Sequence, residues 1–479
     1  MNSSIAVEVQ PMFIGGEWVK GEARTTVRLP YDDTPIAELC TADAAIFERA
    51  VRAAQEGAKA MARLSAGERA DLLLRFHDIV KRDLAEFARL ICIESGKPIK
   101  EARGEAERSL QTILAASTVA RTLHGEMIPM DAAPIGKGRM AMTVRQPIGV
   151  IGAITPFNVP LNLALHKVTP AIAGGNAIIH KPALQTSLSA VRMGRALEEA
   201  GIPKGGYNLL LGSGARLGPL LVEDPRLAMI TFTGSVPVGK SIRAAAGLKR
   251  VTLELGNNSA VIVEPDADVD YAASRCVAGA FAHSGQVCIS VQRIFVQEDV
   301  AGRFIEKYVA ETNKLKIGHP LEESTDISSL ISVQEARRVE NWIHEAVEQG
   351  AKRLTGGPRS HATIPPAILE GAPASVNINC SEVFGPVVNV ARYRDFDDAV
   401  AQANDSRFGL QAGIFTNDMH RAFTAAQQLQ VGGVIINDVS AFRADHMPYG
   451  GVKESGTGRE GPRYAVEEMT EMKLICWKV

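Results

Sequence analysis

Apolar residues recur at helical spacing through much of the first third of the chain. A capping-box pattern at Ser65 and Glu68 opens one such stretch, and Gly96 followed by Pro98 closes it. A second helix is predicted over residues 99–123. The pattern therefore predicts two long helices in succession.

From residue 149 the pattern changes to short apolar runs that alternate with helical segments. The runs cover residues 149–155, 176–181, 207–212, 228–234 and 250–255. This alternation is typical of βαβ units, which form a parallel sheet covered by helices on both faces. Each run ends in a polar or glycine-rich turn, so we expect these turns to meet at the sheet edge where ligands bind.

A second series of apolar runs and helical segments, from about residue 260 to 455, predicts another α/β domain. Residues 125–147 carry prolines and glycines at intervals and indicate an extended hairpin. The apolar segment at the C-terminus reads as a strand. Because an isolated strand leaves its edge unpaired, we expect it to pair with the hairpin or with another subunit.

Composition narrows the function classes. A chain of 479 residues predicts two or three domains, and a net charge of −2 gives no basic surface for nucleic acid. No apolar run approaches the roughly 20 residues of a membrane span, and the N-terminus does not resemble a secretory signal. The six scattered cysteines predict neither a disulfide framework nor a metal site, so we expect a cytoplasmic protein with reduced thiols.

Several residues with possible chemistry follow the predicted strands, but each is weak evidence alone. Lys181 is by itself an ordinary surface charge, and Ser235 an ordinary helix cap. The glycines in 212–218 are one residue too widely spaced for the dinucleotide fingerprint. Glu254 at a buried strand end needs partners or a raised pKa. Cys288 taken alone is a packing residue.

Seven motifs, in this order and approximate spacing, resemble the aldehyde dehydrogenase superfamily, and within it the bacterial lactaldehyde and phosphonoacetaldehyde dehydrogenase-like branch. They are PFN (156–158), KPA (181–183), FTGS (232–235), LELG (253–256), GQVC (285–288), EVFGPV (382–387) and PYGGVKESGTGRE (448–460). The resemblance covers nearly the whole chain.

The resemblance implies an α/β fold with a Rossmann-like cofactor domain, a second α/β catalytic domain and a small β oligomerisation arm. The expected boundaries are 1–124 with 148–254 for the NAD(P)-binding domain, 255–454 for the catalytic domain, and 125–147 with 465–479 for the arm. A homodimer or homotetramer is expected.

The resemblance also implies the catalytic roles. Cys288 matches the nucleophile that forms a thiohemiacetal and then a thioester, and its backbone N–H and the Asn158 amide match the oxyanion donors. Glu254 matches the general base that hydrolyses the thioester. Lys167 and Glu460 match polar residues linked to proton transfer around that base.

The implied cofactor is NAD or NADP. Leu184 stands where many NAD-preferring members carry a glutamate that repels a 2′-phosphate, which leaves both cofactors open. The matching cofactor residues are Thr155, Pro156, Lys181, Ala183, Gly214, Gly218, Phe232, Gly234, Ser235, Leu255, Gly256, Glu382 and Phe384.

The substrate is expected to be a small aldehyde between the apolar Val159, Val287 and Ile289. Arg108 and Arg443 either bind a carboxylate, phosphonate or phosphate at its far end or form structural ion pairs.

Three alternatives remain. A CoA-acylating aldehyde dehydrogenase generally lacks the base that Glu254 provides. A cysteine hydrolase needs a histidine poised for Cys288, and although His283 is near in sequence, no catalytic histidine motif surrounds it. A non-enzymatic structural relative would not need Cys288, Glu254 and Asn158 together.

Overall fold

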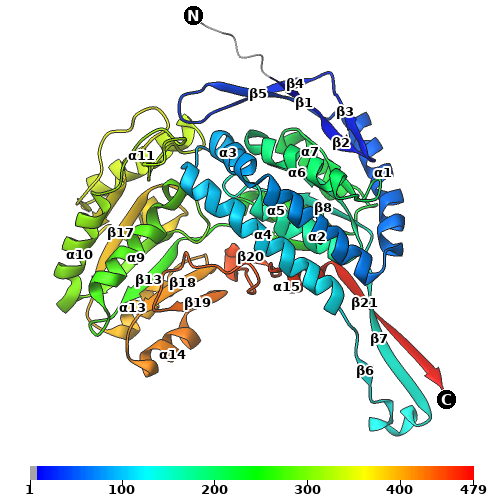
Figure 1. The fold of residues 1–479 in the computed structure, drawn as a ribbon. Coiled ribbons are helices and arrows are strands. Elements are labelled where there is room, and N and C mark those ends of the chain that lie inside the picture. Colours follow the sequence, from blue (N-terminus) through cyan, green and yellow to red (C-terminus); the bar gives the residue numbers. More distant parts are fainter. Residues whose placement is uncertain (1–7) are drawn as a thin grey trace, which may run out of the picture.

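Two large sheets organise the computed structural model, which describes residues 8–479 (Figure 1). The first has eight strands in the order β20-β12-β11-β8-β9-β10-β2-β3, and the second has seven in the order β15-β16-β17-β14-β13-β18-β19. Two three-stranded sheets accompany them, β1-β5-β4 near the N-terminus and β21-β7-β6 in a projecting arm.

The five apolar runs predicted as strands form the parallel centre of the first sheet. They are β8 (Val150–Ile154), β9 (Ala177–Lys181), β10 (Tyr207–Leu209), β11 (Met229–Thr233) and β12 (Arg250–Glu254). Short antiparallel strands extend this sheet: β2 (Met12–Ile14), β3 (Glu17–Val19) and β20 (Gly456–Thr457). From β8, the next strands in the chain, β9 and β10, lie on one side of it in the sheet. Strands β11 and β12 lie on the other side of β8.

Helices accompany the first sheet. They are α1 (Ala44–Arg63), α2 (Ala66–Arg82), α3 (Leu84–Ser95), α4 (Ile99–Thr122), α5 (Asn162–Ala173), α6 (Leu188–Glu199), α7 (Gly214–Glu223) and α8 (Val236–Ala245). The predicted capping box at Ser65 is present, and Gly96 ends α3 with a left-handed φ of 74°. The single helix predicted between them is wrong, because Asp83 breaks it into α2 and α3.

Sequence reasoning missed the strands before residue 41. Besides β2 and β3, these are β1 (Val9–Gln10), β4 (Arg24–Arg28) and β5 (Pro35–Cys40). They have two to six residues each, too few to show a clear apolar period.

The second sheet and its helices follow the style of the first, as predicted. Its strands are β13 (Ser259–Val263), β14 (Val291–Gln297), β15 (Lys352–Arg353), β16 (Ala367–Glu370), β17 (Val387–Tyr393), β18 (Gln411–Phe415) and β19 (Gly433–Ile436). Its helices are α9 (Val269–Phe281), α10 (Glu298–Thr312), α11 (Val333–Glu348), α12 (Asn377–Cys380), α13 (Phe396–Asn404) and α14 (Met419–Gln428).

The C-terminal strand pairs with the hairpin region of the same chain. Strand β21 (Thr470–Lys478) lies antiparallel to β7 (Arg139–Pro147), which also pairs with β6 (Met127–Ile128). Figure 1 shows this arm extending away from the two large sheets, preceded by α15 (Pro462–Glu468). Among the described helices, none is both long and apolar enough to cross a membrane.

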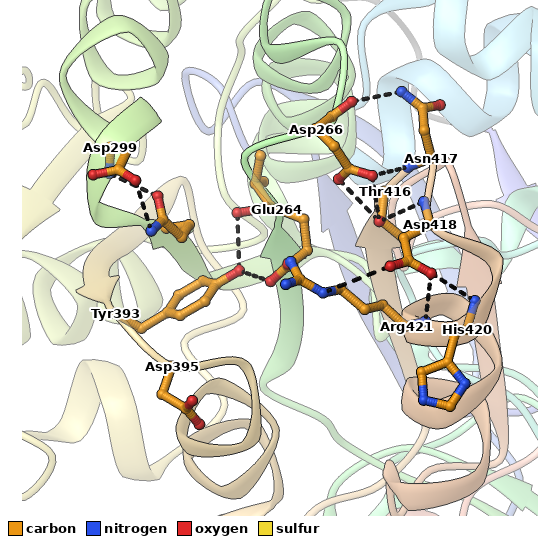
Figure 2. Close-up of polar contacts among 12 residues, drawn as sticks. Glu264, Asp266, Asp299, Tyr393, Asp395, Thr416, Asn417, Asp418, His420 and Arg421 are labelled. Carbon is orange, nitrogen blue, oxygen red and sulfur yellow. Dashed lines mark hydrogen bonds and ion pairs between the residues drawn. The ribbon is translucent and has the colours of Figure 1, made fainter.

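A buried carboxylate ties together three elements of the second sheet domain (Figure 2). Glu264 follows β13 with only 1% of its surface exposed, accepts a hydrogen bond from the Tyr393 hydroxyl and pairs with Arg421 of α14. Nearby, Asp266 accepts a hydrogen bond of 3.0 Å from the Thr416 hydroxyl. A carboxylate at a strand end is stable here because it has both a cation and a donor.

This arrangement predicts a stability effect. Tyr393→Phe removes one donor from a buried charge, and we expect the free energy of unfolding to fall by about 2 kcal/mol, as for a hydrogen bond to a charged group. Urea titration followed by circular dichroism measures the change. An unchanged midpoint would mean that Arg421 alone satisfies Glu264.

Candidate active site

The first sheet brings the predicted turns to one edge. The strand order changes direction between β8 and β11, and in parallel α/β sheets the ligand crevice opens at such a point, beyond the carboxyl ends of the strands. Thr155 and Pro156 follow β8, and Gly234 and Ser235 follow β11. These four predicted cofactor residues therefore flank the crevice.

Cys288 lies between the short helix η4 (Ala282–Gly285) and β14, at the amino end of the second sheet. The Asn158 amide, which follows β8, donates a hydrogen bond of 2.8 Å to the Gln286 carbonyl oxygen. This contact joins the turn after β8 to the segment that carries the thiol. The Cys288 Sγ lies 2.8 Å from the Tyr449 hydroxyl. Burial raises the pKa of the Cys288 thiol to about 12.

Glu254 ends β12 and is 3% exposed. Neither carboxylate oxygen has a hydrogen-bond partner among residues 8–479, in contrast to Glu264. Burial raises the pKa of Glu254 well above its usual range, and the negative charge of Glu460 raises it further. A Cβ at position 450 would lie 2.9 Å from Glu254 Oε1, so Gly450 leaves the space that this carboxylate occupies.

Lys167, Glu460 and Arg443 form a buried ion cluster. Lys167 Nζ lies 2.6 Å from Glu460 Oε1, and Arg443 Nη2 lies 3.1 Å from Glu460 Oε2. Burial raises the pKa of Glu460, but the two cations outweigh it and lower that pKa to about 2. The Arg443 guanidinium carbon also lies 3.7 Å from the centre of the Tyr449 ring. Arg443 therefore contacts both Glu460, whose charge acts on Glu254, and Tyr449, which lies beside Cys288.

Two predicted polar residues lie at the carboxyl ends of β9 and β11, Lys181 as the last residue of β9 and Ser235 after β11. Ser235 is the first residue before α8, yet its hydroxyl makes no capping hydrogen bond within the described chain, whereas Ser213 caps α7 by accepting from the Arg216 N–H. Lys181 is 4% exposed, and burial lowers its pKa to about 8. A Cβ at Gly214 would lie 3.8 Å from Lys181 Nζ, so the structure brings these two predicted residues together.

The segment 382–384 contacts turns that follow strands of the first sheet. Glu382 accepts a hydrogen bond of 3.0 Å from the Asn257 N–H, and a Cβ on Gly256 would collide with its carboxylate. Phe384 has a left-handed φ of 49° and packs edge-on against Phe157, with ring centres 5.7 Å apart. Burial raises the pKa of Glu382 to about 7. Glu382 therefore contacts the turn that follows β12, and Phe384 contacts the turn that follows β8.

The remaining predicted cofactor residues have simpler surroundings. Phe232 and Leu255 are 5% exposed and pack in the hydrophobic core around the first sheet. Ala183 precedes the short helix η3 (Leu184–Thr186), and Gly218 lies within α7.

A cavity of about 900 Å³ lies beside this site. Among the described residues, Arg108, Val159 and Val287 line it, but Ile289 and Arg443 do not. Ile289 is instead buried against Leu410 and Tyr449. Of the three predicted apolar walls, the structure thus places two in the cavity.

Both predicted arginines form ion pairs. Arg443 pairs with Glu460, and Arg108 makes two hydrogen bonds to Asp445, of 2.8 and 3.1 Å. Asp445 also accepts a hydrogen bond from Asn162. Asp445 is buried, but hydrogen bonds from its neighbours, including Arg108, hold its pKa well below the usual range. Arg108 nevertheless keeps 46% of its side chain exposed.

Sequence reasoning missed Tyr449 and Asp445. Tyr449 lies inside the PYGGVKESGTGRE motif, and a tyrosine followed by two glycines could have indicated it as a site residue. Asp445 had no signal, since it meets Arg108 from 337 residues away. No hydrogen bond joins the His283 ring to Cys288 among residues 8–479. His283 lines the cavity with two ring nitrogens that have no partner in the described part of the chain.

Comparison with known proteins identifies the family. Residues 18–475 match the model of the aldehyde dehydrogenase family. A 3-sulfolactaldehyde dehydrogenase from Priestia aryabhattai is 46% identical over 475 residues, 99% of each chain. Aldehyde dehydrogenase 21 from Physcomitrella patens, solved with its reaction product succinate, has a TM-score of 0.96 and 39% identity over 99% of each chain. A glyceraldehyde-3-phosphate dehydrogenase from Methanocaldococcus jannaschii, solved with NADP, has a TM-score of 0.92 and 39% identity, covering 95% of this chain and 99% of its own. This protein therefore belongs to the aldehyde dehydrogenase family, the NAD(P)-dependent enzymes that oxidise aldehydes.

Proposed function

We propose that this enzyme oxidises a small aldehyde to the carboxylic acid through a covalent adduct on Cys288, which water cleaves with Glu254 as base. The observation that carries the proposal is a buried carboxylate, without a partner among the described residues, in the same site as a thiol at the junction of the two sheets. Glu254 lies near enough to raise the pKa of Cys288 by its charge.

The first step forms a bond between Cys288 Sγ and the aldehyde carbon, and the carbonyl electron pair moves to oxygen. Because burial keeps the thiol pKa high, the thiol loses its proton to solvent water during the attack. The Asn158 amide has two N–H donors, and the bond to Gln286 uses one. The other N–H, together with the Cys288 backbone N–H, stabilises the oxyanion.

In the last step water adds to the thioester carbon and the C–S bond breaks, which releases the carboxylic acid and the Cys288 thiolate. Glu254 accepts a proton from that water, and the raised pKa makes it a stronger base than an ordinary carboxylate. Lys167 and Arg443 keep Glu460 ionised, and the charge of Glu460 raises the pKa of Glu254. The charges of Lys167 and Arg443 themselves lower the pKa of Glu254, so the cluster sets this pKa by opposing effects, with burial the largest.

The residues at the crevice fit a dinucleotide. The free Ser235 hydroxyl at the start of α8 suits a pyrophosphate, Lys181 suits the adenosine ribose, and Glu382 suits the hydroxyls of the second ribose. A bound NAD or NADP would supply the acceptor for the hydride of the thiohemiacetal carbon. Leu184 carries no charge that would repel a 2′-phosphate, so we expect NADP to be accepted as well as NAD.

A small anionic aldehyde suits the cavity. Its walls at Val159 and Val287 are apolar, and the Arg108 guanidinium lies at its edge. Two of the five N–H donors of Arg108 bind Asp445, which leaves the others for an anionic ligand. The relatives named for 3-sulfolactaldehyde and glyceraldehyde 3-phosphate, and the one solved with succinate, concern compounds with an anionic group. Phosphonoacetaldehyde and semialdehydes are therefore the anionic substrates to test first, with lactaldehyde as the neutral comparison.

The arm suits self-association. Its strand β21 exposes the apolar side chains of Met472, Leu474, Ile475 and Trp477. We expect residues 125–147 and 465–479 to pack against a second copy of the chain in a dimer or tetramer. We also expect the boundary between the cofactor and catalytic domains to lie at residue 254. Sedimentation analysis tests the oligomeric state, and a monomer would contradict it.

The reaction itself is tested by formation of reduced cofactor at 340 nm, with each aldehyde, with NAD or NADP, and with or without CoA. We expect turnover without CoA. A requirement for CoA would favour the acylating alternative. If the protein binds the cofactor but none of the aldehydes leads to its reduction, the proposal is contradicted and a structural role is favoured.

Removal of Arg108 should affect anionic substrates selectively. We expect Arg108→Ala to raise KM for succinate semialdehyde about tenfold or more, since a charge-assisted hydrogen bond is lost, and to change KM for propanal little. Arg103→Ala is the matched control, because Arg103 lies on the same helix and pairs with Glu323 instead. Equal effects on both aldehydes would show that Arg108 serves only its ion pair with Asp445.

A further inference from the structure

The turn that leads to Cys288 has an unusual backbone conformation. His283 and Ser284 have φ values of 48° and 53°, and Gly285 follows with 75°. A left-handed conformation is uncommon for residues other than glycine, and it persists only where surrounding contacts fix it. Two such residues in succession therefore need contacts that hold them, and this turn ends three residues before the thiol.

A carboxylate from a distant helix holds the start of this turn. The His283 backbone N–H donates a hydrogen bond of 2.7 Å to Glu101 Oε2. Glu101 lies in the first turn of α4, 182 residues away in the sequence, and both residues line the cavity of about 900 Å³. A hydrogen bond to an ionised carboxylate is stronger than one between neutral groups. Glu101 is thus a strong anchor for the first left-handed residue.

The other anchors of the turn are neutral. The Ser284 hydroxyl donates a hydrogen bond of 2.9 Å to the Ser328 carbonyl oxygen. Gln286 Oε1 accepts one of 2.8 Å from the Ile331 N–H. Both contacts tie the turn to the segment that precedes α11. Within residues 8–479, Glu101 is the only charged side chain that hydrogen-bonds to the segment 282–288.

The conformation of the turn determines where the reactive atoms lie. A relaxed φ at His283 or Ser284 would redirect the chain that follows, and so move both Sγ and the backbone N–H of Cys288. That N–H is one of the proposed oxyanion donors. A misplacement of about 1 Å at a reacting group can slow a reaction about 100-fold. A contact that keeps the turn left-handed therefore acts on the rate of the reaction.

We propose that Glu101 is a positioning residue, whose carboxylate holds the left-handed turn at His283 and thereby fixes Cys288 for attack on the aldehyde. The inference rests on the oxidation proposed above. Glu101 acts through the backbone of the turn, so its effect does not depend on which aldehyde is oxidised.

Glu101→Ala should lower kcat for propanal about tenfold and change KM less than about twofold, because the turn loses a charge-assisted hydrogen bond while the apolar walls of the cavity remain. Glu101→Gln keeps an acceptor oxygen. Burial raises the pKa of Glu101 to about 7, so a neutral side chain with an acceptor oxygen is already present in part at neutral pH. We therefore expect Glu101→Gln to restore kcat to within about twofold of the wild type. A glutamine variant as slow as the alanine variant would overturn the inference.

Glycine at position 283 tests the backbone strain directly. Glycine adopts a left-handed φ without a steric penalty, so a turn with His283→Gly should depend less on Glu101. His283→Ala is the matched control, since it also removes the imidazole but keeps Cβ. We expect Glu101→Ala to lower kcat about tenfold in the His283→Ala background and less than about threefold in the His283→Gly background. Equal losses in the two backgrounds would contradict a role in holding the turn.

Alkylation by iodoacetamide, followed by mass spectrometry, gives a measurement that does not depend on turnover. Cys288 is only partly exposed, and a released turn should admit solvent to the thiol. In Glu101→Ala we expect Cys288 to be alkylated about threefold faster or more, because burial no longer holds the thiol pKa high. The exposed Cys380 is the internal control and should react at its wild-type rate. An unchanged rate at Cys288 would overturn the inference. If the wild-type enzyme oxidises no aldehyde, the proposed function fails instead, and alkylation still tests the positioning.

Discussion

Cys288→Ala should abolish aldehyde oxidation while leaving cofactor binding intact. The variant lacks the sulfur that forms the adduct, and no other thiol lies in the predicted catalytic set, so we expect kcat to fall by about 10⁴-fold or more. Steady-state formation of reduced cofactor measures the loss. Cofactor affinity, measured by isothermal titration calorimetry, should stay within about twofold, since the groups that suit the dinucleotide lie on other segments.

The matched control is Cys380→Ala, which removes an exposed thiol from α12. It should retain full activity. A collapse of cofactor affinity in Cys288→Ala would assign Cys288 a structural role, and substantial residual oxidation would assign the nucleophile elsewhere.

Glu254→Gln should separate the two halves of the reaction. Thioester formation needs Cys288 and the oxyanion donors, whereas hydrolysis needs the base, so we expect hydrolysis to slow by about 10²–10⁴-fold. Rapid mixing should then show a burst of about one reduced cofactor per site, followed by slow turnover. Glu264→Gln changes another buried carboxylate at a strand end and should lower stability without producing a burst.

The pH dependence of hydrolysis tests the same assignment. A base works when it is ionised, and the pKa of Glu254 lies well above the usual carboxylate range. The rate of hydrolysis should therefore rise as pH increases through that raised pKa. In Glu254→Gln this rise should disappear. A wild-type rate that is already at its plateau near pH 5 would contradict the raised pKa.

Much of the fold was predictable because strands and helices have local signatures. The five apolar runs became the parallel strands β8 to β12, since a buried parallel strand must be apolar on both faces. The break at Asp83 was not predictable, because the apolar spacing continues across it and only tertiary packing decides where the helix bends. The short N-terminal strands depend in the same way on neighbours distant in sequence.

The site shows the same division. The strand-end turns and the seven motifs indicated Cys288, Glu254 and Asn158 as candidates. The sequence offered two interpretations of Arg108, and the structure adds the ion pair with Asp445 while leaving much of the side chain facing a cavity. Ile289 was expected in the wall of the substrate site beside Val287 and instead packs against Leu410 and Tyr449, because residues 287–290 form a turn, closed by a 2.9 Å hydrogen bond from the Ser290 N–H to the Val287 carbonyl oxygen.

By itself, the sequence determined the alternation of strands and helices, the family and the candidates for the reactive groups, because all of these depend on residue type and local order. Tertiary structure alone decided which groups meet. Glu254 lies at the carboxyl end of the first sheet and Cys288 at the amino end of the second, so only the packing of the two sheets brings them into one site. The same packing places the Tyr449 hydroxyl on the thiol and leaves Glu254 without a partner among residues 8–479, and no linear pattern encodes either contact.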